Sequence, residues 1–176
     1  MGRSLSQIPN HRAAFRASVQ VAAVCYRRQA REIEFLLVRT SSGKWIFPKG
    51  RAHSLLSDSE AALREAWEEA GVLGCIEPEC FHTFWYSKGL GQDFEETAVL
   101  MKAYLLEVLH QYEPVEEDRA PTWFAPAEAR SRLGEERDPR MRRTLAAVLD
   151  RARERIRPEE FTAGSPSRNL GVTRAG

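Results

Sequence analysis

Three glutamates, Glu65, Glu68 and Glu69, lie within five residues of one another in a segment with a helical pattern. Residues three and four apart share one side of a helix, so the three carboxylates fall on one face. Carboxylate oxygens suit a hard divalent cation such as Mg²⁺ or Mn²⁺, which completes its shell with water and substrate phosphates. No histidine stands at ligand spacing, which disfavours zinc. The competing interpretation is a solvated acidic face, the usual reason for a run of charge on a helix.

The helix that carries these glutamates has its own start and stop signals. Ser57 with Glu60 three residues later matches a capping box, and Gly71 can adopt the left-handed conformation that ends a helix. The spacing predicts a helix over residues 57–70 with one core face and one acidic face. Four apolar residues fall within about 100° of one another and make up the expected core face: Leu63, Ala66, Trp67 and Ala70.

A short loop before this helix supplies positive charge. Lys49 and Arg51 flank Gly50, a breaker that gives the backbone close access to a ligand. Cations and backbone groups at this place could reach phosphates held at the metal-bearing end of the helix. Taken alone, Lys49 and Arg39 fit ordinary surface charges equally well.

The segment from Gly50 to Val72 resembles the Nudix box, in which a glycine and an Arg-Glu-x-x-Glu-Glu-x-Gly core stand at fixed separation. Gly50 opens the pattern here, and residues 64–72 (Arg-Glu-Ala-Trp-Glu-Glu-Ala-Gly-Val) close it. One position departs, because the first glutamate of the pattern falls on Leu56. Asp58 is a nearby carboxylate that could take its place.

The resemblance implies an α/β fold, the Nudix α/β/α sandwich with a mixed β-sheet between helices. It implies hydrolysis of a nucleoside diphosphate linked to another moiety, with Mg²⁺ or Mn²⁺ as cofactor. Glu65, Glu68, Glu69 and the Gly50 carbonyl would hold the metal, and Arg64 would orient the glutamates. The family places the general base variably, so Glu68, Glu95 and Glu96 stay open as candidates.

A second resemblance narrows the expected substrate. Residues 45–50 (Trp-Ile-Phe-Pro-Lys-Gly) are similar to the lead-in of the diadenosine polyphosphate and diphosphoinositol polyphosphate hydrolases, and residues 84–88, 112–119 and 123–129 agree more loosely. This similarity implies a small, highly phosphorylated substrate. Five cations are expected contacts for its phosphates: Arg39, Lys49, Arg51, Lys88 and Arg119.

Other functions stay open at this point. Another Nudix substrate is one alternative, namely ADP-ribose, a damaged nucleotide or an RNA cap. A second is a sensor that binds a nucleotide without cleaving it; the three glutamates argue against a sensor, and Leu56 favours one. Trp85 or Tyr86 could stack on a base, with buried packing expected for at least one of them. His82 is expected to be structural, and His53 fits either a substrate contact or an exposed loop.

Composition limits the remaining possibilities. With 176 residues the chain suffices for one domain, expected over residues 15–156 between flexible polar tails at 1–14 and 157–176. The net charge of +1 gives no field to gather nucleic acid, and no apolar run approaches the ~20 residues that span a membrane. Three cysteines in no zinc or disulfide pattern favour the cytoplasm. We therefore expect no stable nucleic-acid partner and no membrane association.

The elements that must position the glutamates can be predicted from short apolar runs and breakers. Beyond the helix described above, the pattern predicts helices over residues 126–133 and 139–156. Strands are expected over residues 18–26, 32–39, 72–86, 97–108 and 121–125, with a short strand and loop within 43–50. Hairpin-length and crossover-length connections together favour a mixed sheet covered by helices on both faces.

Overall fold

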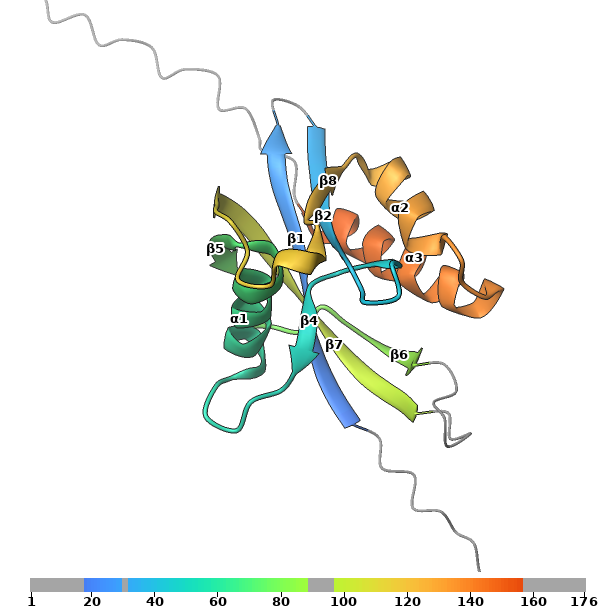
Figure 1. Ribbon diagram of the computed structural model, residues 1–176, viewed down its shortest axis with the longest axis horizontal. Coiled ribbons are helices and arrows are strands. Elements are labelled where there is room, and N and C mark those ends of the chain that lie inside the picture. Colours follow the sequence, from blue (N-terminus) through green and yellow to red (C-terminus); the bar gives the residue numbers. More distant parts are fainter. Residues whose placement is uncertain (1–17, 30–31, 89–96, 157–176) are drawn as a thin grey trace, which may run out of the picture.

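The computed structural model describes residues 18–29, 32–88 and 97–156 (Figure 1). The tails predicted at 1–14 and 157–176 lie outside the described residues. The elements follow in the order β1 (Ser18–Gln29), β2 (Glu32–Arg39), β3 (Trp45–Ile46), β4 (Lys49–Arg51), α1 (Asp58–Ala70), β5 (Val72–Ile76), β6 (His82–Lys88), β7 (Thr97–Gln111), the 3-10 turn η1 (Glu117–Arg119), β8 (Thr122–Phe124), α2 (Pro126–Gly134) and α3 (Pro139–Arg155).

The sheet is built around two long parallel strands, β1 and β7, paired from Ser18 with Val99 to Tyr26 with Glu107. The middle of β1 is a continuous buried run, as expected for a strand covered on both faces. β2 and β4 pair antiparallel with β1, and β5 and β6 pair antiparallel with β7. β3 and β8 extend the sheet from β2. The sheet is therefore mixed, as predicted.

Helices cover both faces of this sheet, with α1 on one side and the α2–α3 pair on the other (Figure 1). Side chains along β7 alternate between the two faces of the sheet, and their contacts show which helices cover each face. Lys102 pairs with Asp58 of α1 at 2.6 Å, so the even-numbered residues face α1. Tyr86, which lies opposite Val99 on the other face, accepts a hydrogen bond from Arg137 in the loop before α3. The expected α/β architecture, a mixed sheet between helices, is confirmed.

Two predictions, one of a strand and one of a loop, are wrong. The stretch 72–86 is two strands, because Glu77, Pro78 and Glu79 interrupt it before β6 begins. Residues 49–51, predicted as loop from Pro48 and Gly50, form β4 because they pair with Gln20, Val21 and Ala22 of β1. Tertiary pairing thus overrides the local breaker signal. No helix among the described residues is long and apolar enough to cross a membrane.

Candidate metal centre and substrate site

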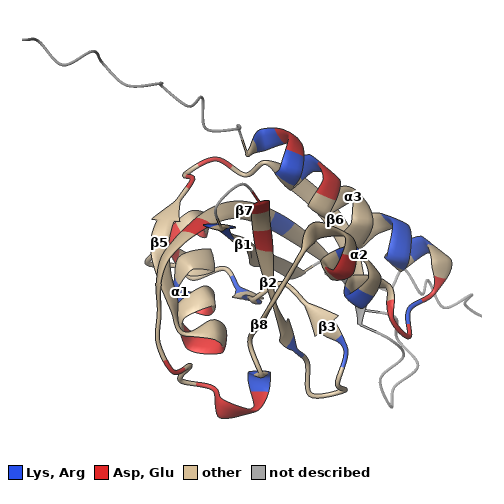
Figure 2. Cartoon of the chain, turned by 90° about the horizontal axis from the view of Figure 1, so that it is seen from above, with Lys and Arg blue, Asp and Glu red and all other residues tan. Residues whose placement is uncertain are grey.

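The ends of α1 are formed as the sequence predicts. The backbone N–H of Glu60 donates to Ser57 Oγ at 3.3 Å, and the Glu60 carboxylate accepts the Ser57 backbone N–H at 2.8 Å. Gly71 ends the helix in the left-handed region, with φ of 67°. These caps fix where α1 starts and stops. Figure 2 shows the acidic positions on α1.

The core face of α1 differs from the predicted one. Leu63 and Trp67 are only half-buried, whereas Ala62, Ala66 and Ala70 are fully covered by the sheet. Glu69 is three residues after Ala66 and therefore belongs to this buried stripe. Its side chain is only 2% exposed, so the expected separation of Glu69 from the core face is wrong, and the competing interpretation of a solvated face does not fit Glu69.

Glu69 keeps its carboxylate in this buried place through two polar partners. The backbone N–H of Lys49 donates to Oε2 at 3.0 Å, and the Arg119 guanidinium pairs with Oε1 at 2.8 Å. Burial raises the pKa of Glu69 to about 7, although Lys49 and Arg119 both act to lower it. A carboxylate desolvated to this degree is a strong ligand for a cation that can reach it.

Glu65 lies one turn earlier, directly against β4. A Cβ placed on Gly50 would stand 2.0–2.1 Å from the Glu65 carboxylate atoms, so only glycine leaves room for this carboxylate. Glu65 is 12% exposed, and burial, followed by the charge of Glu68, raises its pKa. Gly50 and Glu65, both expected to hold the metal, therefore lie next to each other.

Glu68 is the most exposed of the three glutamates and faces Arg64. The Arg64 guanidinium lies 3.5 Å from Glu68 and 3.8 Å from Glu65, so one arginine stands between two of the predicted ligands. This is the position expected of a residue that orients them. Glu95 and Glu96, the other candidate bases, lie outside the described residues.

The carboxylate and carbonyl oxygens predicted as ligands fit a hard divalent cation, but the carboxylates are not already arranged around one metal position. Within the described ranges, no three His, Cys, Asp or Glu side chains converge closely enough to hold a metal. Glu69 is paired with Lys49 and Arg119, and Glu68 lies 3.5 Å from Arg64, so each of these two carboxylates faces a protein partner. The fit rests on the buried Glu69 carboxylate and on the space that Gly50 leaves for Glu65.

The predicted phosphate contacts do not all point to the same place. Arg51 is exposed on β4, and Lys49 beside it is half-buried. Arg39 lies over the Trp45 ring, 4.3 Å from its centroid, and donates to the Gly43 carbonyl at 2.8 Å. The Lys88 side chain lies outside the described residues.

Arg119, expected to bind substrate, contacts protein groups in this structure. Besides Glu69, it pairs with Glu116 at 2.6 Å, and η1 thereby rests on α1. Glu116 also donates its backbone N–H to the Glu68 carbonyl at 2.9 Å. The sequence analysis did not predict that η1 rests on α1. The one local sign of an ordered turn was the opposite charges of Glu116 and Arg119, three residues apart.

The aromatic and histidine positions divide as the sequence suggested. Tyr86 is buried, and Trp85 is 47% exposed. His82 is half-buried beside Phe84, and burial lowers its pKa, which fits a structural residue. His53 is exposed, and its Nδ1 accepts the Leu55 N–H at 3.2 Å within the loop.

The structure also shows what contacts are made by Leu56, the one departure from the box, and by Asp58, the carboxylate that could replace the missing glutamate. Leu56 packs partly buried against the hydrophobic core, so it serves packing at that place. Asp58 pairs with Lys102 at 2.6 Å at the start of α1. Asp58 is thus engaged with the sheet rather than with the glutamates of the last two turns.

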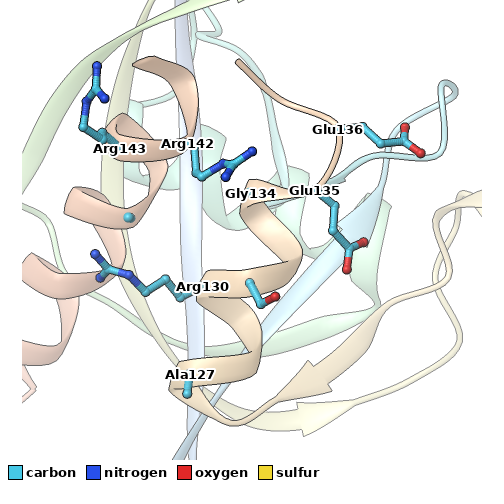
Figure 3. Close-up of a pocket in the computed structure, with 9 residues that line it drawn as sticks. Ala127, Arg130, Gly134, Glu135, Glu136, Arg142 and Arg143 are labelled. Carbon is cyan, nitrogen blue, oxygen red and sulfur yellow. The ribbon is translucent and has the colours of Figure 1, made fainter. Parts of the chain in front are cut away.

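A separate hollow lies between α2 and α3, on the opposite side of the sheet from α1. It measures about 560 Å³, and both arginines and glutamates line it (Figure 3). Arg130 is paired with Asp150 at 2.5 Å, and Arg142 donates to the Arg137 carbonyl. This hollow does not include any of the predicted site residues.

The chain is similar to known proteins in both sequence and fold. The family model described as the NUDIX domain matches residues 17–148. Nudix hydrolase 17, mitochondrial, of Arabidopsis thaliana is 33% identical over 121 residues. That alignment covers 68% of this chain, and the chain spans 63% of the length of the relative.

Solved structures share the fold at lower sequence identity. The Ap4A hydrolase of C. elegans in a binary complex has a TM-score of 0.55 and 23% identity, covering 76% of this chain and 98% of that one. The NUDIX domain of Shewanella oneidensis NrtR, crystallised with ADP ribose, has a TM-score of 0.60 and 18% identity, covering 85% and 94%. At these identities the likeness concerns the fold.

Proposed function

The chain belongs to the NUDIX domain family, and from that premise we propose that it is a metal-dependent hydrolase of phosphoanhydride bonds. Its substrate would be a nucleoside diphosphate linked to another moiety. The observation that carries the proposal is the pair of desolvated carboxylates on α1, with Glu65 against Gly50 and Glu69 buried one turn later. A purely solvated acidic face would bury neither carboxylate.

The proposed roles follow from the placement of each group. Glu65, Glu68, Glu69 and the Gly50 carbonyl would hold Mg²⁺ or Mn²⁺. Such an ion supplies neutralisation of the phosphate oxygens and a lowered pKa for a bound water. Arg64 stands between Glu65 and Glu68 and holds their orientation. The more exposed Glu68 is the glutamate of the box that a water proton could reach most easily.

Phosphates of the substrate would be bound by cations next to the carboxylates. Lys49 and Arg51 lie on β4 beside Gly50, and Arg39 lies at the end of β2. Lys88 and Arg119 are two further residues that the sequence analysis expects to contact phosphates. Positive charge at these places offsets the repulsion that several phosphates experience beside an acidic helix.

For the substrate we propose a diadenosine polyphosphate or a diphosphoinositol polyphosphate. The Trp45–Gly50 lead-in supports this choice, and the fold of the C. elegans Ap4A hydrolase is compatible with it. The cation set is also suited to a ligand with several phosphates.

A nucleotide sensor is the second candidate function. Two observations favour it: Glu69 is already paired with Arg119, and Leu56 replaces a glutamate of the box with a packed apolar side chain. A sensor would bind the same ligands without releasing product.

We also propose that the protein works in the cytoplasm. All three cysteines are free, with Cys25 buried and Cys75 and Cys80 exposed, which suits a reducing compartment. The Arabidopsis relative is named as a mitochondrial protein.

The deciding experiment is a substrate panel assayed for product release with Mg²⁺ and, separately, with EDTA. The panel contains diadenosine polyphosphates, diphosphoinositols, ADP-ribose, a capped RNA and nucleoside triphosphates. The proposal expects Mg²⁺-dependent cleavage, fastest with a member of the first two classes. Glu65→Gln should lose this activity, while Glu128→Gln, the same change on the exposed face of α2, should keep it. Ligands that bind without being cleaved would establish the sensor instead.

A further inference from the structure

Arg119 ties the segment before β8 to the buried carboxylate of α1. Its Nη2 lies 2.8 Å from Glu69 Oε1, and its Nε donates to Glu116 Oε2 at 2.6 Å. Its Nη1 also donates to the Arg39 carbonyl at 3.5 Å. The guanidinium thus neutralises a carboxylate that has only 2% exposure and little water to solvate it.

A divalent cation at Glu69 would compete with this guanidinium. Oε2 of Glu69 already accepts the Lys49 backbone N–H, and Oε1 is the atom that faces Arg119. A doubly charged ion at that oxygen would stand within a few ångströms of a fixed positive charge, and such repulsion is strong in a partly desolvated site. Both cations cannot be held at full strength by the same carboxylate.

The turn that carries Arg119 has a defined start and end. Ala120 follows directly with φ of 45° and ψ of 59°, a left-handed conformation uncommon for a residue with a side chain. Glu116, three residues before Arg119, is anchored separately through its backbone N–H, which donates to the Glu68 carbonyl. The Arg119 side chain is 25% exposed, so rotation about its own bonds can take the guanidinium away from Glu69 while the backbone of the turn stays on α1.

We infer that Arg119 is a built-in counter-cation, which holds Glu69 in the metal-free protein and is displaced when Mg²⁺ or Mn²⁺ binds. This inference rests on the proposed function, because it takes Glu69 to be a metal ligand. Displacement frees a guanidinium beside the place where substrate phosphates would lie. Metal binding and exposure of a phosphate-binding cation thereby become one event.

The test is the affinity for Mn²⁺, followed by the electron paramagnetic resonance signal of the free ion, with no substrate present. The proteins compared are wild type, Arg119→Gln and the control Arg155→Gln. Arg155 also pairs with two carboxylates, Glu77 and Glu79, but stands at the end of α3. A buffer near pH 8.5 keeps the glutamates well ionised.

The inference expects Arg119→Gln to bind Mn²⁺ roughly tenfold more tightly than wild type, because a charge-assisted hydrogen bond no longer has to be broken. Arg155→Gln should match wild type. Equal or weaker binding by Arg119→Gln would overturn the inference, since Arg119 would then be neutral toward the metal or would support it. Wild type that binds no Mn²⁺ at all would instead refute the metal site of the proposed function.

A second measurement needs no variant, in case Arg119→Gln is too unstable to purify. The side-chain Nε–H resonance of Arg119 in the wild-type protein reports its short bond to Glu116 and its place beside Glu69. The inference expects this resonance to shift or broaden as diamagnetic Mg²⁺ is added, with the same midpoint as metal binding. A resonance that stays unchanged at saturating Mg²⁺ would contradict it.

Discussion

Replacement of Gly50 by alanine tests the geometry of the site at one atom. The new Cβ would stand 2.0 Å from the Glu65 carboxylate carbon, whereas ordinary contact begins at 3.4 Å, so the carboxylate must move by about 1.4 Å. The atoms in the way are the end of a flexible side chain, and Gly50 has no left-handed φ that alanine would resist. The side chain should therefore give way while the backbone stays in place.

The expected cost in stability is small. An off-rotamer Glu65 costs about 0.5–1.5 kcal/mol, and the reduced freedom of the unfolded chain returns about 0.4–1 kcal/mol. The free energy of unfolding, measured in urea, should therefore change by less than about 1 kcal/mol. A displacement beyond 1 Å in a ligand of the reacting centre should lower the hydrolysis rate about 100-fold.

The assay is Mg²⁺-dependent product release from the best substrate of the panel, with urea unfolding on the same preparations. Gly134→Ala in α2 is the matched control, because its Cβ meets the flexible Arg142 side chain at 3.0 Å. That variant should keep its activity. A folded Gly50→Ala variant with wild-type activity would refute the role of Glu65, and an unfolded one would refute the claim that its side chain gives way.

Three further predictions concern α1 and the cysteines. Glu69→Gln keeps an acceptor for the backbone but loses the charge, so hydrolysis should fall at least about 100-fold; unchanged Mg²⁺-dependent rates would exclude Glu69 as a ligand. Ser57→Ala removes the helix cap and should lower the free energy of unfolding by about 1 kcal/mol, and an unchanged urea midpoint would contradict this. Burial raises the pKa of the Cys25 thiol, so a thiol reagent should label Cys75 and Cys80 in the native protein and reach Cys25 only after unfolding; labelling of all three in the native protein would disagree.

Local signals in the sequence predicted α1 well. The Ser57–Glu60 capping box and the left-handed Gly71 are decided by a few neighbouring residues, so they appear in the structure as expected. The core face was harder to predict because Leu63 and Trp67 are larger and more apolar than Ala62. The flat contact with the sheet selects the small residues Ala62, Ala66 and Ala70 instead.

Contacts distant in sequence account for what could not be predicted. β4 exists because residues 49–51 meet β1, and no local pattern shows that partner. The pairing of Arg119 with Glu69 joins residues 50 positions apart, and its distance of 2.8 Å depends on how η1 crosses α1. The burial of Glu69 could have been predicted once Ala62 and Ala66 were placed on the core face, because residues seven and three positions apart lie on the same side of a helix.

The central claim is that the glutamates of α1 hold the divalent cation that hydrolysis requires. The most direct test is the rate of product release from a diadenosine polyphosphate during Mg²⁺ titration, for wild type and for a variant with Glu65, Glu68 and Glu69 all changed to Gln. The account predicts a saturable dependence on Mg²⁺ in wild type and no hydrolysis in the variant at any Mg²⁺ concentration. Hydrolysis by wild type in EDTA, or by the folded variant with Mg²⁺, would contradict it.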